Sequence, residues 1–242
     1  MLARKYKSKL KSIQNPFTGI YTLEFESLDR PFKYHPGQFL HIAIDEDYDG
    51  SGQWPDSRCF SMQSNPKEET IKITYAVKGS FTKQMEENLK VGSEIWLKLP
   101  YGDLFQQAHN KENTVFIAGG TGITPFLSLF THESFNEYIS PKIYLGFRSK
   151  EFNIYQNELD RMTKIREIRS NSCNSYKCNS SSLVKSFYED KDGVLDIYKI
   201  ADDNGSNSNY FISGPPAMIK VFKQVLIEKG VATGNVLTDD WE

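Results

Sequence analysis

An apolar segment, a glycine-rich turn and a second apolar segment follow one another at residues 115–130, and this order strongly constrains the fold. Val115-Phe116-Ile117 predicts a buried strand, and Phe126-Leu127-Ser128-Leu129-Phe130 has the spacing of a helix. The turn between them, Gly119-Gly120-Thr121-Gly122-Ile123-Thr124-Pro125, brings bare backbone amides to a helix N-terminus, where a phosphate binds favourably. Pro125 suits the first helical turn because its missing N–H costs no hydrogen bond there. The alternative is a tight strand–helix turn without a ligand.

Proline stands where the third glycine of the G-x-G-x-x-G dinucleotide motif would be, so the turn is not that fingerprint. The pattern of apolar and polar residues also differs between residues 1–108 and residues 109–242. Residues 1–108 predict a barrel of short strands, at 20–25, 39–44, 71–77 and 94–99, with one helix at 83–89. Residues 109–242 predict a parallel α/β sheet, with strands at 115–118, 142–147 and 209–212 and helices at 125–135, 151–163 and 217–229.

The remaining segments complete this two-domain reading. Gln106 to Asn113 is polar and predicts the linker, and residues 165–168 are strand-like. Asn171 to Ser182 is rich in serine and asparagine and predicts a loop. A barrel followed by an open α/β sheet predicts a ligand crevice at the carboxyl ends of the parallel strands.

Composition excludes several classes of protein. A net charge of −2 gives no support to a nucleic-acid partner, and a 38% hydrophobic, 13% aromatic chain predicts a globular fold. No apolar run approaches the roughly 18 residues of a membrane helix, and no secretory signal follows the basic N-terminus. Three cysteines are too few for a disulfide scaffold or a four-thiolate iron–sulfur site. The sequence therefore predicts a cytoplasmic protein without a membrane or nucleic-acid partner.

Two stretches of the first domain have residues that suit a diphosphate. Arg58-Cys59-Phe60-Ser61 offers a guanidinium fork for a phosphate, a ring that could flank a flat cofactor, and a hydroxyl. Gly79-Ser80-Phe81-Thr82 leads from a strand into a helix. Each has a plainer reading: a surface arginine beside a core phenylalanine, and a helix N-cap by Ser80 or Thr82.

Taken together, these motifs resemble a known family. Arg58-x-Phe60-Ser61, Gly79-x-x-Thr82, the glycine-rich turn and Ser213-Gly214-Pro215-Pro216 stand in the order and approximate spacing of the ferredoxin–NADP⁺ reductase family of flavoenzymes. Pro36-Gly37-Gln38-Phe39 also matches its first-domain signature. The resemblance covers roughly Ala3 to Glu242. It implies a six-stranded antiparallel flavin-binding barrel (1–108) followed by a Rossmann-like parallel α/β nucleotide-binding domain (109–242).

The resemblance also implies roles for residues of the first domain. Arg58 would bind the flavin phosphate, Phe60 would pack on the flavin in place of the commoner tyrosine, and Ser61 would lie near the reactive N5. The turn at Lys78, Gly79, Ser80 and Thr82 would hold a pyrophosphate, which favours FAD over FMN. Further FAD contacts would come from Cys59, Tyr75 and Val77.

In the second domain the resemblance assigns Gly120, Thr121, Gly122, Pro125, Gly214 and Pro215 to the nicotinamide nucleotide. Ser213 stands where many relatives have cysteine, close to the meeting point of nicotinamide and flavin. The C-terminal Asp240-Trp241-Glu242 resembles the family's ending, so Trp241 would stack near the flavin; a surface tryptophan is the alternative. Ser61, Ser213 and Trp241 are thus the candidate catalytic residues, with turn hydroxyls as the plainer reading of both serines.

Arg148 follows the strand 142–147 and is a candidate nucleotide contact, or a solvated arginine at a strand end. A 2′-phosphate on the adenosine ribose needs basic and hydroxyl residues nearby. Arg169, Ser170 and Lys177 are candidates because they follow the strand-like residues 165–168. The sequence leaves both NADPH and NADH open and leans to NADPH.

The predicted function is NAD(P)H-dependent electron transfer through FAD to a one-electron carrier of the ferredoxin or flavodoxin type, by a monomeric enzyme. Alternatives are the reductase component of an oxygenase, a ferric reductase, or a flavin- and nucleotide-binding regulatory subunit with little turnover. The basic run Arg4 to Lys9 would dock an acidic carrier, or would protect an edge strand. Cys173 and Cys178 lack enough nearby ligands for a metal site, so no metal is expected.

Overall fold

The computed structural model describes residues 1–172 and 183–239, and the side chains of residues 167–172 are not described. By its internal contacts the chain forms two units. The first comprises Met1–Phe105 and Thr124–His132, and the second comprises Gln106–Ile123 and Glu133–Glu242. The domain boundary between residues 108 and 109 stays a prediction.

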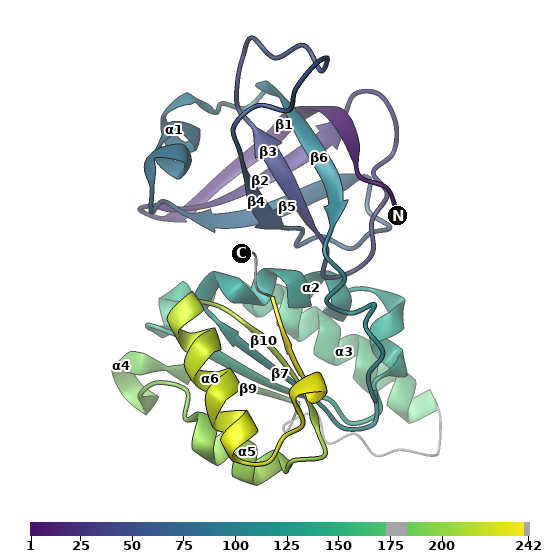
Figure 1. The fold of residues 1–242 in the computed structure, drawn as a ribbon, viewed down its shortest axis with the longest axis vertical. Coiled ribbons are helices and arrows are strands. Elements are labelled where there is room, and N and C mark those ends of the chain that lie inside the picture. The colour runs from purple at the N-terminus through teal and green to yellow at the C-terminus, as the bar shows by residue number, and fades with distance from the viewer. Residues whose placement is uncertain (173–182, 240–242) are drawn as a thin grey trace. The chain divides into compact units, whose positions relative to one another are not determined.

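The first unit is built on one antiparallel sheet of six strands (Figure 1). The strands are β1 (Arg4–Phe17), β2 (Ile20–Ser27), β3 (Phe39–Ala43), β4 (Ser57–Ser61), β5 (Thr70–Ala76) and β6 (Glu94–Tyr101). Their order is β4-β3-β6-β1-β2-β5, and among the strand pairs of this unit none joins β4 to β5. One backbone bond, from the Gln63 N–H to the Lys72 carbonyl at 2.8 Å, ties the segment after β4 to β5. The predicted six-stranded antiparallel fold is confirmed.

Period-two alternation explains how this sheet encloses its core. Ile71 and Ile73 on β5, Leu23 and Phe25 on β2, and Leu97 on β6 are all fully or almost fully buried. Residues between them, such as Lys72 and Glu24, are only half-buried. Because successive side chains of a strand point to opposite faces, each strand gives one apolar face to a common core. Helix α1 (Ser80–Asn88) adds Phe81 and Met85 to that core.

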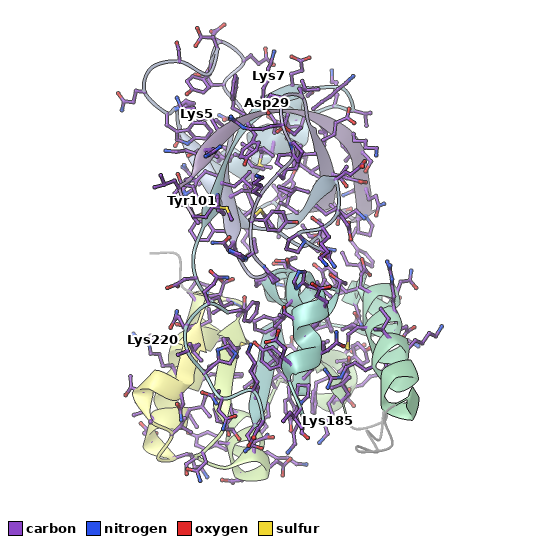
Figure 2. The ribbon with its side chains drawn as sticks, turned by 90° about the vertical axis from the view of Figure 1, so that its right-hand side faces the viewer. Lys5, Lys7, Asp29, Tyr101, Lys185 and Lys220 are labelled. Carbon is purple, nitrogen blue, oxygen red and sulfur yellow. The ribbon has the colours of Figure 1, made fainter. Side chains whose placement is uncertain are left out.

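Strand β1 lies inside the sheet, between β6 and β2, so the prediction of an edge strand is wrong. Within the basic run, Arg4 to Lys9 all pair with β6, whereas the pairing with β2 begins at Ser8. Lys5 donates from Nζ to the carbonyls of Gly50 (3.0 Å) and Gly52 (3.2 Å), and Lys7 pairs with Glu94 at 2.7 Å. Figure 2 labels both lysines. These cations are engaged within the chain, which leaves the docking role of the run without structural support.

The second unit is built on a parallel sheet of five strands in the order β11-β10-β7-β8-β9. They are β7 (Thr114–Gly119), β8 (Lys142–Phe147), β9 (Val184–Tyr188), β10 (Asn209–Ser213) and β11 (Val236–Thr238). All five residues of β10 are buried, as expected for a parallel sheet covered on both faces. Figure 1 shows α5 and α6 in front of this sheet and α3 behind it. The predicted parallel α/β fold is confirmed.

The helices of the chain are of very different lengths. The α-helices after α1 are α2 (Thr124–Phe130), α3 (Gln156–Ser172), α4 (Glu189–Asp192), α5 (Ile197–Asn204) and α6 (Pro216–Glu228). The 3₁₀ turns are η1 (Gly120–Ile123), η2 (Glu133–Glu137), η3 (Lys150–Phe152) and η5 (Thr233–Asn235). Within residues 1–172 and 183–239, none of the helices combines the length and the apolar character that a membrane crossing requires.

Two predicted segments of the second domain are wrong. Residues 165–168 belong to α3, because Leu159 and Met162 are buried at helical spacing and Arg166 donates to the Phe135 carbonyl at 2.9 Å. The predicted helix 125–135 ends at Phe130, where the Thr131 hydroxyl donates to the Leu127 carbonyl at 2.8 Å. The pattern also missed β9 and β11. The predicted loop at 171–182 lies largely outside the described residues.

His109, in the segment predicted as the linker, has both ring nitrogens bonded. Nδ1 lies 2.6 Å from the Gln107 carbonyl, which only accepts, so Nδ1 carries the proton of the neutral ring. Nε2 then accepts from the Tyr138 hydroxyl at 2.7 Å. Burial lowers the pKa of His109, opposed by its bond to the Gln107 carbonyl. The neutral ring is therefore the form that the folded chain favours.

We expect the free energy of unfolding to fall as the pH drops through the range below about 6.5, the usual pKa of histidine. In that range the unfolded chain binds more protons at residue 109 than the folded chain. Urea unfolding at about pH 7.5 and about pH 5.5 measures this loss of stability. His109→Asn should lose less stability over the same interval. Equal losses in the two proteins would contradict this assignment; the burial-lowered pKa of His41 acts in both and cancels.

Candidate functional site

On the first unit, Arg58 lies beside the start of α1. It is an exposed residue of β4, and its guanidinium carbon lies 5.1 Å from the centre of the Phe81 ring. Nη1 donates to the Asp56 carboxylate at 2.6 Å and to the Ser57 carbonyl at 2.7 Å. An ion pair this exposed contributes little stability, so a diphosphate could replace Asp56 as the partner. The structure thus brings together the two stretches of the first domain that the sequence singled out.

The turn before α1 is organised by the Thr82 hydroxyl. It accepts from the N–H groups of Lys78 (3.0 Å) and Gly79 (3.1 Å) and donates to the Gly79 carbonyl (3.0 Å). The N-cap residue is therefore Gly79, so the plainer reading of Ser80 or Thr82 as the N-cap is wrong, and Thr82 fixes the turn from the third helical position. Ser80 and Phe81, the first residues of a nine-residue helix, still direct their amides out of its N-terminus. A guanidinium beside these amides is a donor set that fits a diphosphate.

Aromatic rings gather behind this donor set. Phe60 is half-buried, and its ring centre lies 5.8 Å from that of Tyr75. Tyr75 stacks in turn on Tyr21 at 5.5 Å, and burial raises the pKa of its hydroxyl. Val77 packs against the same core. Cys59 and Ser61 are half-buried on β4, opposite His41 and Phe39 of β3. The predicted flavin contacts of this domain thus lie on β4, β5 and the turn into α1.

In the second unit, two glycine turns touch through their backbones. A Cβ on Gly122 would lie 2.5 Å from Cα and N of Gly214 and from the Ser213 carbonyl oxygen. A Cβ on Gly119 would lie 2.8 Å from the Met218 sulfur and 3.1 Å from Pro215. The turns after β7 and β10, neighbours in the sheet, can therefore approach this closely only with glycine at these positions.

The turn after β7 does not lead directly into an α-helix. The 3₁₀ turn η1 intervenes, and α2 begins only at Thr124, with Pro125 as its second residue. All seven residues of α2 are buried, whereas Gly120 is exposed and Thr121 and Gly122 are half-buried. Gly120 has a φ of +55° and open space where a Cβ would be. The accessible part of the predicted phosphate turn is therefore Gly120 to Gly122, upstream of the helix.

Ser213, the last residue of β10, is buried and has an acidic partner. Its hydroxyl donates to the Asp239 carboxylate at 3.2 Å, and the Asp239 N–H donates to the Ile212 carbonyl at 3.1 Å. Sequence reasoning missed Asp239 because the short β11, which carries it to the end of β10, has no recognisable strand pattern of its own. Its position next to the family-like C-terminal ending was the only signal.

Of the remaining candidate site residues, the structure describes Arg148 but not the side chains of the others. Arg148 is exposed at the end of β8, and its carbonyl accepts from the Asp190 N–H at 3.2 Å. The side chains of Arg169 and Ser170, and all of Lys177, Cys173, Cys178 and Trp241, lie outside the described residues. In the part of the chain that the structure describes, no three His, Cys, Asp or Glu residues cluster as a metal site would require.

Comparison with known proteins covers both units. Residues 116–224 match the family model of the oxidoreductase NAD-binding domain. Sulfhydrogenase 2 subunit gamma of Pyrococcus furiosus is 26% identical over 227 residues, which are 90% of this chain and 76% of that protein. The reductase component of propane 2-monooxygenase of Mycolicibacterium smegmatis is 25% identical over 243 residues, 97% of this chain and 67% of that protein.

Solved structures share the whole fold. A flavohemoglobin from Malassezia yamatoensis, solved with bound FAD and heme, matches with a TM-score of 0.73 and 20% identity, over 97% of this chain and 59% of that one. Phthalate dioxygenase reductase matches with a TM-score of 0.70 and 17% identity, over 97% of this chain and 67% of that one. At these identities the likeness shows the fold. Residues 116–224 thus contain an oxidoreductase NAD-binding domain, and this match, the whole-chain relatives and the shared two-unit fold support the resemblance to the ferredoxin–NADP⁺ reductase-like family of FAD- and NAD(P)-binding oxidoreductases.

Proposed function

We propose that this protein takes electrons from NAD(P)H and passes them through FAD to a one-electron carrier protein of the ferredoxin or flavodoxin type. The observation that carries the proposal is the presence, in one chain, of both halves of such a path. Residues 116–224, most of which lie in the second unit, match the oxidoreductase NAD-binding domain, and the first unit presents Arg58 and the start of α1 as a diphosphate donor set. When bound, FAD would accept a hydride and release the two electrons one at a time. A nicotinamide cannot release electrons one at a time.

The roles proposed for individual residues come from the family resemblance, supported by position for the residues that the structure describes. Arg58 and the amides at Ser80 and Phe81 hold the FAD diphosphate, with Thr82 fixing the turn at Lys78 and Gly79. Phe60, Tyr75, Val77, Cys59 and Ser61 line the flavin. Gly120, Thr121 and Gly122 hold the dinucleotide phosphates, helped by Pro125, Gly214 and Pro215. Ser213 orients the nicotinamide, and Trp241 is the proposed stacking residue.

Reconstitution with FAD tests the proposal directly. The purified chain should bind FAD with a flavin absorption spectrum that bleaches when NADH or NADPH is added without oxygen. Re-oxidation by ferricyanide, a one-electron acceptor, should then be catalytic. A protein that binds no FAD, or holds FAD that neither nucleotide reduces, would refute the proposed function.

Two relatives favour a second candidate, the reductase component of a larger enzyme system. Their names are those of a sulfhydrogenase gamma subunit and of a monooxygenase reductase component. Under this candidate the carrier is an oxygenase or an iron–sulfur partner, and the chain is active only in complex with it. A ferric reductase would turn over with ferric chelates alone, and a regulatory subunit would reduce ferricyanide only slowly. The monomeric state and cytoplasmic location are also proposals; size-exclusion chromatography tests the first and cell fractionation the second.

We expect Ser213→Ala to lower kcat/KM for NAD(P)H by about three- to tenfold, the range for one lost hydrogen bond, without changing FAD retention. The substitution removes the hydroxyl that Asp239 holds at the end of β10. Ser208→Ala is a matched control: Ser208 is also buried, donates to the Asn204 carbonyl at 2.7 Å, and lies before β10 rather than after it. Equal losses in both variants would show a general effect on β10 and refute a specific role for Ser213.

A further inference from the structure

Helix α2 belongs by its contacts to the first unit, although the turn that leads into it belongs to the second. The accessible turn residues, Gly120 to Gly122, are followed by Ile123, and one peptide bond joins Ile123 to Thr124, the first residue of α2. All seven residues of α2 are buried, so the helix cannot shift without repacking its surroundings. Whatever holds α2 in place therefore also holds the end of the proposed dinucleotide turn.

A buried serine of α2 bonds to the backbone of the first unit. The Ser128 hydroxyl, 0% exposed, donates to the Ser64 carbonyl at 2.8 Å. Ser64 is itself fixed, because its hydroxyl oxygen accepts from the Lys72 N–H at 3.0 Å and lies 3.0 Å from the Tyr34 hydroxyl. Tyr34 then receives the Ser64 proton and donates its own to the Ser64 carbonyl at 3.1 Å. The Ser64 carbonyl thus accepts both bonds that its lone pairs allow.

The next residue supplies a second bond to the same segment. Asn65 Nδ2 donates to the carbonyl of Thr131, which directly follows α2, at 2.6 Å. Asn65 Oδ1 accepts from the Lys67 N–H at 2.9 Å, so the amide is oriented with Nδ2 and not Oδ1 toward Thr131. Because Ser128 and Thr131 are three residues apart, two adjacent residues hold one turn of the segment from both of its ends.

These anchoring residues continue the strand that carries the proposed flavin contacts. Strand β4 ends at Ser61, and Ser64 follows three residues later. The two residues between them are buried, and the Gln63 N–H donates to the Lys72 carbonyl of β5 at 2.8 Å. The path from Ser61 to Ser128 is therefore short and tied to the sheet, so a displacement of α2 relative to β4 requires that the Ser128 bond break.

We propose that Ser128 is a positioning residue for hydride transfer, because its bond to the Ser64 carbonyl holds α2, and with it the end of the dinucleotide turn, to the segment that follows β4. Hydride transfer requires that the reacting atoms be held about 3–3.5 Å apart. A small shift of the turn therefore costs rate even when each cofactor stays bound. This inference rests on the proposed function and adds to it a residue outside both proposed cofactor sites.

Ser128→Ala on the FAD-loaded full chain tests the inference, because it removes only the hydroxyl. The Ser64 carbonyl keeps its bond from Tyr34, so no buried acceptor is left unpaired. The limiting rate of anaerobic flavin reduction, at saturating NADH or NADPH, should fall by about three- to tenfold, the scale of one lost hydrogen bond. Calorimetry should find the affinity for ADP-ribose nearly unchanged, because ADP-ribose carries the diphosphate but no nicotinamide to align with the flavin.

Hydrogen–deuterium exchange of the apoprotein provides a readout that does not depend on turnover. The backbone amides of residues 120–124 should exchange faster in Ser128→Ala than in the wild type, because the turn is less firmly held. Thr131→Val is the matched control: it removes a hydroxyl that bonds within the same segment, to the Leu127 carbonyl at 2.8 Å. That carbonyl keeps the Thr131 N–H at 3.0 Å, so this variant should match the wild type in all three measurements.

A second variant tests the neighbouring bond. Asn65→Asp keeps an acceptor for the Lys67 N–H but places a carboxylate oxygen against the Thr131 carbonyl, so it should slow flavin reduction at least as much as Ser128→Ala. An unchanged limiting rate in Ser128→Ala, or an equal loss in Thr131→Val, would overturn the role of Ser128 alone. A parallel loss of ADP-ribose affinity would overturn it too, as general damage to the turn. A wild type whose flavin neither nucleotide reduces would refute the proposed function and this inference together.

Discussion

Replacing Arg58 with alanine is expected to weaken FAD binding by about 30-fold, which corresponds to about 2 kcal/mol. The guanidinium is the charged member of the donor set beside α1, and a charge-assisted bond to a phosphate is stronger than a neutral one. Its loss should not disturb the fold, because Arg58 is exposed and its partner Asp56 remains solvated. Fluorescence titration of the apoprotein with FAD measures the change in dissociation constant.

Arg4→Ala is the matched control for this experiment. Arg4 is an exposed arginine of the same unit, at the start of β1, so its replacement removes the same charge at a different place. It should leave the FAD dissociation constant nearly unchanged. If both variants bind FAD like the wild type, or if both weaken it equally, the guanidinium of Arg58 does not contact the diphosphate.

Gly122→Ala is expected to lower NAD(P)H-dependent flavin reduction by about tenfold or more, through strain of about 1–3 kcal/mol. The added methyl group would lie 2.5 Å from backbone atoms of Gly214 and Ser213, and backbone cannot rotate aside as a side chain can. The turns after β7 and β10 must separate, which disturbs the proposed dinucleotide site. Stopped-flow reduction measures the loss of rate, and urea unfolding measures the strain.

Gly234→Ala serves as the control, because nothing lies within 4 Å of a Cβ built there and its backbone φ is not in the left-handed region. It should be as stable and as active as the wild type. Normal reduction by the Gly122→Ala protein would mean that the two turns need not touch for nucleotide binding. The FAD dissociation constant should stay constant in both variants, since the proposed FAD contacts lie in the other unit.

Sequence alone predicted the local elements with strong periodicity. The strand 142–147 has the predicted bounds, and the alternation of residues 71–77 corresponds to β5 with a shift of one residue. The order of the short motifs led to the family, and Arg58 does lie beside the start of α1. In each of these cases the information is contained in neighbouring residues, where propensity and side-chain period act directly.

What the sequence could not predict depends on contacts between distant residues. Strand β1 looks like an edge strand because of its lysines, yet β2 and β6 pair with both of its sides. Asp239 reaches Ser213 only because β11 pairs with β10. Such features follow from register and packing, for which a single sequence gives no periodic signal.

Helix α2 has a consequence for any attempt to divide the gene. Although it lies between β7 and β8 in sequence, its contacts group it with the first unit. The Ser128 hydroxyl donates to the Ser64 carbonyl at 2.8 Å, and Asn65 Nδ2 donates to the Thr131 carbonyl at 2.6 Å. A truncation after Phe105 would remove both contacts and expose the surface that α2 buries. A contiguous half of this chain is therefore not a complete unit that could be exchanged with that of another protein.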